Sequence, residues 1–245
     1  MGRYQAVLFD FGGTLFSYRR IGAEALDLVR RGAVYLGVEG ELPTLGRAYR
    51  DASRAAYELF APRPFYLHRE LFHETFRRFA ASVGARATAE QLDWFHEEQR
   101  LLLLRGFELR SDCVEVLERL RGLGLHVGVV SNIDDDYLDP MLQRAGLDEV
   151  LDAWTSSEEA ASCKPDSRIF ERALGKAGVR PDEALFVGDS LEHDVIGARR
   201  LGMTAVLIRE PGAAPPGAGI GEVGEPHHVI ETLSQVVPLL SHASA

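Results

Sequence analysis

The chain has 245 residues, 46% of them hydrophobic and 26% charged, which is typical of a soluble globular protein. Its formal net charge of −10 argues against sequence-independent nucleic-acid binding, which depends on Lys and Arg neutralising phosphates. The apolar runs are too short for a membrane span or a signal peptide, so we expect a cytoplasmic protein with no membrane or nucleic-acid partner.

The first predicted element is a buried strand over residues 6–9, whose apolar side chains lead directly to Asp10 and a pair of glycines. Over residues 18–105 the apolar side chains instead recur every three or four positions, which is typical of helices. We therefore predict a core domain formed by residues 1–17 and 106–245, interrupted by an all-helical insert at residues 18–105.

The remainder of the chain alternates predicted strands with predicted helices. The strands are expected over residues 127–130, 153–155, 185–187 and 205–208. The helices are expected over residues 114–123, 138–145, 168–177 and 194–201, with a last one over 229–240 after a Gly/Pro-rich loop at 211–226. This alternation implies a mostly parallel sheet covered on both faces. The predicted fold class is therefore α/β, with a Rossmann-like doubly wound parallel sheet.

Polar side chains follow three of the predicted strands, namely Asp10, Ser131 with Asn132, and Asp189. Because the carboxyl ends of parallel strands share one edge, Asp10 and Asp189 should approach each other. Neighbouring carboxylates repel, and a hard cation such as Mg²⁺ relieves that repulsion. Lys164, one of two lysines in the chain, should neutralise a second negative group there. Such a site suits phosphoryl transfer through an aspartyl-phosphate.

Four segments carry a family resemblance: Asp10-Phe11-Gly12-Gly13-Thr14, Ser131-Asn132, Lys164-Pro165-Asp166, and Gly188-Asp189-Ser190 through Asp194. In order and spacing they resemble the four motifs of the haloacid dehalogenase-like (HAD) hydrolase superfamily. The helical insert resembles that superfamily's C1-type cap domain. The stretch from 129 to 208 looks most like the subfamily of HAD-like hydrolase domain-containing protein 3. The resemblance spans nearly the whole chain and specifies the fold far more closely than the substrate.

The resemblance implies a Mg²⁺-dependent phosphatase that acts on a small phosphorylated metabolite. Asp10 would be the nucleophile and a metal ligand. The backbone carbonyl of Gly12 and the carboxylate of Asp189 would be further ligands. Asp194 would support the metal through water or through the neighbouring ligands.

The resemblance also implies a set of groups that hold the substrate. Thr14, Ser131 and Asn132 would bind the transferring phosphoryl group, and Lys164 would balance the charge of the phosphorylated intermediate. The identity of the metabolite and the oligomeric state are not indicated by the sequence.

One position departs from the family pattern. Phosphatases of the superfamily usually carry an aspartate two residues after the nucleophile, where it acts as general acid and then as general base, whereas this chain has Gly12. The backbone carbonyl for the metal is kept, but the proton carrier is lost. Such a loss typically costs roughly 10²–10⁴-fold in rate, and least for good leaving groups such as aryl or acyl phosphates. His193 is an alternative acid/base, although a histidine at the start of a surface helix is more common.

Two other functions stay open. Gly12 is compatible with a non-catalytic or weakly active protein that binds a metal or a metabolite. Phosphonate hydrolases of the family need a cap lysine, and residues 18–105 contain none; dehalogenases of the family carry tyrosine at the position of Gly12. Separately, Asp134-Asp135-Asp136 could be read as a metal cluster, but we expect it to cap the following helix in solvent, because acids favour helix N-termini.

Overall fold

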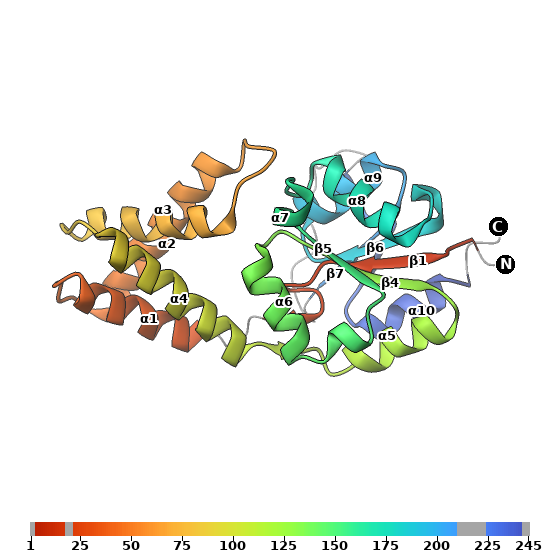
Figure 1. Ribbon diagram of the computed structural model, residues 1–245, viewed down its shortest axis with the longest axis horizontal. Coiled ribbons are helices and arrows are strands. Elements are labelled where there is room, and N and C mark those ends of the chain that lie inside the picture. Colours follow the sequence, from red (N-terminus) through yellow and green to blue (C-terminus); the bar gives the residue numbers. More distant parts are fainter. Residues whose placement is uncertain (1–2, 18–21, 210–223, 242–245) are drawn as a thin grey trace. The chain divides into compact units, whose positions relative to one another are not determined.

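The computed structural model describes residues 3–17, 22–209 and 224–241. The chain forms two compact units, one of residues 1–17 and 108–245 and the other of residues 18–107. Figure 1 shows a sheet flanked by helices in the first unit and helices in the second. Among the described helices, none combines the length and the apolar character that crossing a membrane requires.

The first unit is built on a six-stranded sheet in the order β5-β4-β1-β6-β7-β8, with every pair of neighbours parallel. The strands are β1 (Ala6–Phe9), β4 (His126–Ser131), β5 (Ala153–Ser156), β6 (Ala184–Gly188), β7 (Thr204–Ile208) and β8 (His228–Ile230). The chain builds outward from β1 to β5 and then returns to the other side of β1. This reversal places the topological switch point, where open α/β sheets bind ligands, at the carboxyl end of β1. The predicted fold class is confirmed.

Helices cover both faces of this sheet. They are α5 (Cys113–Gly122), α6 (Asp135–Arg144), α7 (Ser157–Ala160), α8 (Ser167–Ala177), α9 (Ile196–Arg200) and α10 (Val236–Leu239). Helices α8 and α9 lie on one face and α5 and α10 on the other (Figure 1). On the first face Phe170 of α8 packs edge-on against Phe186 of β6, with ring centroids 5.1 Å apart. Burial on both faces explains why the strands read as continuous apolar runs.

Two predicted helices differ in the structure. The sequence pattern predicts a helix over residues 229–240, but His228–Ile230 forms the edge strand β8, followed by a 3₁₀ turn at Leu233–Gln235 and the short α10. Pairing with β7 satisfies its backbone, and β-branched residues such as Val229 and Ile230 favour strands. The helix predicted from residue 194 starts instead with a π-helical turn at Leu191–Val195 that precedes α9. Most of the Gly/Pro-rich loop at 211–226 lies outside the described residues.

The second unit consists of helices joined by turns, with no strand among its described residues, in agreement with the predicted all-helical insert. Its helices are α1 (Gly22–Tyr35), α2 (Leu42–Phe60), α3 (His68–Ser82) and α4 (Ala89–Gly106). In its centre Phe76 of α3 stacks on Phe95 of α4, with ring centroids 4.0 Å apart. Gly32 of α1 lies against both rings, and a Cβ there would be 2.9 Å from each. The absence of a side chain at Gly32 therefore lets α1 pack closely on this aromatic pair.

A small two-stranded sheet lies in the first unit, where the chain leaves that unit and returns to it. Strand β2 (Phe16–Ser17) pairs antiparallel with β3 (Glu108–Leu109). The loop between β1 and β2, which contains Gly12 and Gly13, is closed by a hydrogen bond of 2.9 Å from the Leu15 N–H to the Phe11 carbonyl. This tight loop follows directly on Asp10.

Candidate active site

Asp10 lies at the carboxyl end of β1, in the centre of the sheet. Its backbone N–H donates to the Val187 carbonyl at 2.8 Å, which continues the pairing of β1 with β6 by one residue. Its side chain is buried, and both carboxylate oxygens accept hydrogen bonds. Lys164 Nζ donates to Oδ1 at 2.6 Å, and Thr14 Oγ1 donates to Oδ2 at 3.1 Å. The carboxylate is therefore held in one orientation at the switch point.

Lys164 lies in the loop between α7 and α8, and its side chain is 2% exposed. An ammonium group has three donors, and three acceptors surround it: Asp10 Oδ1 at 2.6 Å, Asp194 Oδ1 at 2.7 Å and the Val130 carbonyl at 2.9 Å. Burial alone would lower the pKa of Lys164, but the charges of Asp10 and Asp194 raise that pKa above its ordinary value. The ammonium therefore stays charged and bridges two carboxylates.

Asp194 is fixed by the π-helical turn at residues 191–195. The Asp194 and Val195 N–H groups both donate to the Ser190 carbonyl, at 3.0 and 3.1 Å. The Asp194 side chain is buried and accepts from Lys164 at Oδ1 and from the Ser190 N–H at Oδ2, the latter at 3.0 Å. A Cβ on Gly188 would lie 2.3 Å from Asp194 Cγ. Only glycine at the end of β6 therefore leaves room for this carboxylate.

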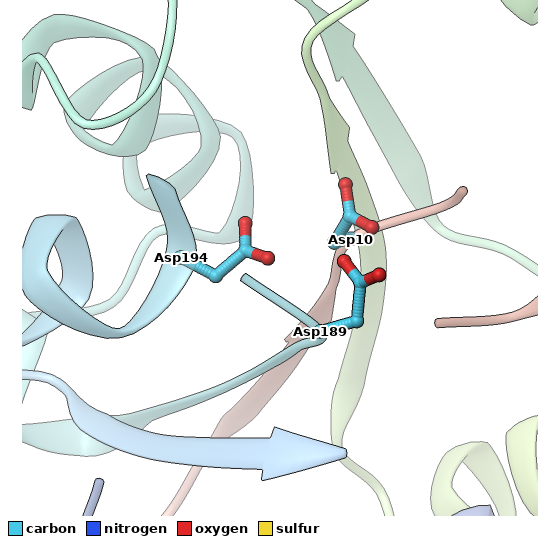
Figure 2. Close-up of side chains that lie close together, drawn as sticks. All are labelled: Asp10, Asp189 and Asp194. Carbon is cyan, nitrogen blue, oxygen red and sulfur yellow. The ribbon is translucent and has the colours of Figure 1, made fainter. Parts of the chain in front are cut away.

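Asp189 completes a group of three carboxylates (Figure 2), in which Asp10, Asp189 and Asp194 each offer an oxygen within 4.8 Å of the others. It is exposed and follows directly on β6. Its carboxylate abuts the backbone of Gly13, where a Cβ would lie 2.1 Å from Asp189 Oδ2. Gly13 also has a φ of +84°, a conformation that favours glycine. Both features require glycine at this position.

The carboxylates of this group disfavour one another's ionised forms. Burial raises the pKa of Asp10 to about 7; Lys164 opposes this rise, while Asp194 and Asp189 add to it. Although Asp189 keeps contact with solvent, partial desolvation by the neighbouring protein atoms and the charge of Asp194 raise the pKa of Asp189 to about 6. Three carboxylates lie together and the ammonium contacts only two of them, so the site carries excess negative charge when all are ionised. A small divalent cation that prefers oxygen ligands would relieve this, so the residues present fit Mg²⁺.

Ser131 and Asn132 follow one another at the end of β4. Ser131 is buried, whereas the Asn132 side chain holds the backbone of Lys164: Nδ2 donates to the Lys164 carbonyl at 3.0 Å, and Oδ1 accepts from the Lys164 N–H at 2.7 Å. His193 Nδ1 donates to the same carbonyl at 3.0 Å. The proton of neutral His193 therefore sits on Nδ1, and both side chains position the Lys164 loop.

The acidic run at residues 134–136 does not cap the following helix in solvent, contrary to the prediction from the sequence. Asp134 occupies the N-cap position of α6 but is fully buried and makes no side-chain capping hydrogen bond. The reason is that Glu158 of α7 supplies the acceptor instead, receiving the Asp135 N–H at Oε2 over 2.9 Å. Asp134, Asp136 and Glu158 offer carboxylate oxygens within 4.8 Å of one another, apart from the group at Asp10.

The sequence motifs did not include Arg110, which the fold brings beside the loop after Asp10. Arg110 Nε donates to the Thr14 carbonyl and Nη2 to the Gly13 carbonyl, each at 2.8 Å. Arg110 lies 96 residues beyond Thr14. No local pattern in the sequence links the two, and only the return of the chain to the core unit joins them.

The chain belongs to the haloacid dehalogenase-like hydrolase family, whose model matches residues 4–202. It is 32% identical over 221 residues to haloacid dehalogenase-like hydrolase domain-containing protein 3 of Bos taurus, covering 84% of this chain and 82% of that protein. It is 29% identical over 205 residues to glyceraldehyde 3-phosphate phosphatase of Methanopyrus kandleri, covering 84% of each. The predicted family and subfamily resemblance is confirmed, and the chain is a hydrolase.

Dehalogenases also occur among the relatives. The chain is 35% identical over 130 residues to (S)-2-haloacid dehalogenase 4A of Burkholderia cepacia, about half of each chain. The fold is shared with the HAD phosphatase from Thermococcus onnurineus, with a TM-score of 0.73 and 23% identity over 98% of this chain and 100% of that one. The family is thus established, but some relatives are named as phosphatases and others as dehalogenases.

Proposed function

We propose that this protein is a Mg²⁺-dependent phosphatase that hydrolyses a small phosphorylated metabolite through an aspartyl-phosphate at Asp10. The observation that carries the proposal is the buried pairing of Asp10 with Lys164 at the switch point of the sheet, 2.6 Å apart. A carboxylate held by a charged ammonium, beside the further carboxylate of Asp189, suits a nucleophile that gains a phosphoryl group. Relatives named as phosphatases support the same class of substrate.

Four groups are proposed for the metal. Asp10, the backbone carbonyl of Gly12 and Asp189 would hold Mg²⁺, and Asp194 would support it indirectly, because both of its oxygens already accept hydrogen bonds from protein groups. When bound, the cation would offset the negative charge of the carboxylates and of the phosphoryl group.

The protein groups divide the reaction into two displacements. A carboxylate oxygen of Asp10 attacks phosphorus, and the bond from phosphorus to the leaving oxygen breaks. Water then attacks the phosphorus of the aspartyl-phosphate, which releases inorganic phosphate and restores Asp10. Throughout, the ammonium of Lys164 balances the charge that develops on the phosphoryl oxygens.

The hydrogen bonds that Thr14 and Asn132 already make limit which of their groups can bind the phosphoryl oxygens. The Ser131 hydroxyl would donate to the phosphoryl group. The side chain of Asn132 already binds the Lys164 backbone, so the backbone N–H of Asn132 would donate to the phosphoryl group instead. Thr14 is fully buried and donates to Asp10, so it would contribute by orienting the nucleophile.

Gly12 has no carboxylate to protonate the leaving group, so that group would leave as an anion. We therefore expect aryl and acyl phosphates to be hydrolysed faster than alkyl phosphates. We further propose that residues 18–105 act as a C1-type cap and provide the contacts that select the metabolite.

The test is release of phosphate from p-nitrophenyl phosphate and from a panel of phosphorylated metabolites, with Mg²⁺ and with EDTA. Asp10→Asn should abolish release. Asp182→Asn is the matched control, because Asp182 is an exposed carboxylate that pairs with Arg180 on the surface of the same unit. Equal rates for wild type and Asp10→Asn would refute the proposal.

A weakly active or purely binding protein is the alternative that Gly12 favours. Gly12→Asp restores the missing acid and should raise turnover of alkyl phosphates more than that of p-nitrophenyl phosphate. Mg²⁺-dependent capture of beryllium fluoride by wild type, lost in Asp10→Asn, would show a functional phosphoryl site even if no metabolite is hydrolysed. No gain from Gly12→Asp, in a protein that binds Mg²⁺, would mean that proton transfer does not limit turnover.

Dehalogenation is the other activity to be measured, because a dehalogenase is among the relatives. Incubation with 2-haloacids should release no chloride, since the dehalogenases that the family includes carry tyrosine where this chain has Gly12. Chloride release that depends on Asp10 would assign the chain to that chemistry.

A further inference from the structure

Arg110 is the first residue after β3, where the chain has returned to the core unit. Its guanidinium donates from Nε to the Thr14 carbonyl and from Nη2 to the Gly13 carbonyl, each at 2.8 Å. Its own N–H donates to the Leu15 carbonyl at 2.9 Å. The planar fork of arginine thus holds two successive carbonyls of the loop that follows Asp10.

This loop contains two adjacent glycines, whose peptide planes rotate more readily than those of other residues. The plane between Gly12 and Gly13 is held by the Gly13 N–H, which donates to the Phe16 carbonyl at 2.9 Å. Because a trans peptide is planar, the Gly12 carbonyl points away from Phe16. The next plane is held by Arg110 through the Gly13 carbonyl. Both planes that flank Gly13 are therefore fixed.

The orientation of this loop matters because of its neighbour. The Gly13 backbone lies so close to Asp189 that a Cβ would be 2.1 Å from Asp189 Oδ2. The Gly12 carbonyl belongs to one of the two peptide planes joined at Gly13, so a rotation at Gly13 would change the orientation of that carbonyl relative to this neighbourhood. The Gly12 carbonyl and the Asp189 carboxylate are two of the ligands proposed for Mg²⁺.

We infer that Arg110 is a positioning residue, which fixes the Gly12 carbonyl beside Asp189 and so sets the affinity of the site for a divalent cation. The inference rests on the proposed function. Groups that orient metal ligands typically change metal affinity by about 10- to 100-fold when they are removed. Arg110 would do so through hydrogen bonds to the loop backbone, without contacting the cation.

Calorimetric titration with Mg²⁺ tests the inference in wild type, Arg110→Ala and Arg110→Lys, each checked for folding by circular dichroism. The dissociation constant for Mg²⁺ should rise about 10- to 100-fold in Arg110→Ala. Arg110→Lys should be weakened similarly, since an ammonium keeps the charge but cannot reproduce the fork. Guanidinium chloride at millimolar concentration, far below denaturing levels, should restore Mg²⁺ affinity to Arg110→Ala. Arg172→Ala is the matched control, because Arg172 binds Glu159 through two N–H groups at the surface.

Each outcome decides the inference. Weak binding in both Arg110 variants, with recovery in guanidinium and unchanged binding in Arg172→Ala, supports it. Wild-type affinity in folded Arg110→Ala overturns it, as does wild-type affinity in Arg110→Lys, which would show that the two-point fork of arginine is not needed. Failure of guanidinium to restore a folded Arg110→Ala also overturns it. If wild type binds Mg²⁺ but releases no phosphate, only the proposed activity fails; if wild type binds no Mg²⁺, both fail.

Discussion

Replacement of Lys164 by methionine tests whether the carboxylates around it are ionised in the folded protein. The change removes an ammonium whose side chain is 2% exposed and which lies 2.6 Å from Asp10 and 2.7 Å from Asp194. Methionine fills much of the volume but leaves two buried carboxylates without their cation. Breaking a buried ion pair by removing one partner typically costs about 3–5 kcal/mol, which is a large share of the roughly 5–15 kcal/mol that stabilises a folded protein.

The loss of unfolding free energy in Lys164→Met should depend on the pH and on the presence of Mg²⁺. Without Lys164 the pKa of Asp10 rises further, and protonation then offsets part of the penalty. We therefore expect the full loss near pH 8 in EDTA and a smaller loss near pH 6. Mg²⁺ at pH 8 should also recover part of the stability, because it supplies positive charge to the same carboxylates.

The assay is urea denaturation followed by tryptophan fluorescence. The chain has two tryptophans, Trp94 in the helical unit and Trp154 in the core unit. In a Trp94→Phe background the fluorescence of Trp154 reports unfolding of the core unit alone. The measured transition then contains no contribution from independent unfolding of the helical unit. The free energy of unfolding of Lys164→Met is then compared with that of the background protein.

A loss below about 1 kcal/mol at pH 8 in EDTA, the size expected for an exposed ion pair, would refute the reasoning. So would a loss that is the same at pH 6 and pH 8. Adding Asp194→Asn to Lys164→Met supplies the control, because removing one of the two carboxylates should restore part of the stability.

Two further predictions concern the loop after Asp10 and the titration of the carboxylates. Gly13→Ala should remove Mg²⁺ binding in calorimetry and destabilise the core more than Gly124→Ala does: both glycines have positive φ, which costs alanine about 1–2 kcal/mol, but a Cβ clashes with Asp189 only at Gly13. Equal effects of the two substitutions would show that the clash is relieved without disturbing the site. Because the pKa values of Asp10 and Asp189 are raised from 3.8 to about 7 and about 6, the folded Mg²⁺-free protein keeps protons that the unfolded chain has released. The stability contributed by these groups should therefore fall as the pH rises from about 4 to about 7, and Mg²⁺ affinity should rise between pH 5.5 and 8; a flat profile in both denaturation and calorimetry would contradict these pKa shifts.

Several features of this protein could be predicted from local sequence patterns. The continuous apolar runs at residues 6–9 and 127–130 indicate strands buried on both faces, and the structure pairs them in parallel at the centre of the sheet. The polar residues that follow such runs, Asp10 and Asp189, consequently lie at one edge. In these cases burial and strand direction are sufficient to place a side chain, because neighbouring parallel strands end together.

The tertiary structure decided what each polar group bonds to. The side chain of Asn132 holds the Lys164 backbone, which leaves the backbone N–H of Asn132 for the proposed contact with the phosphoryl group. The Asp194 carboxylate accepts from Lys164 and from the Ser190 N–H. The strand at residues 228–230 depends on an available edge at β7, which no local pattern reveals.

Composition and residue order by themselves determined the α/β class, the helical insert and the motifs on which the family assignment depends. The absence of a carboxylate at Gly12 is likewise a property of the sequence alone. The hydrogen bonds from Arg110 to the loop after Asp10 were decided by the fold, because they join residues 96 and 97 positions apart. Hydrogen bonds reach only about 3 Å, so partners distant in sequence are set by how the chain returns to the sheet and not by their spacing.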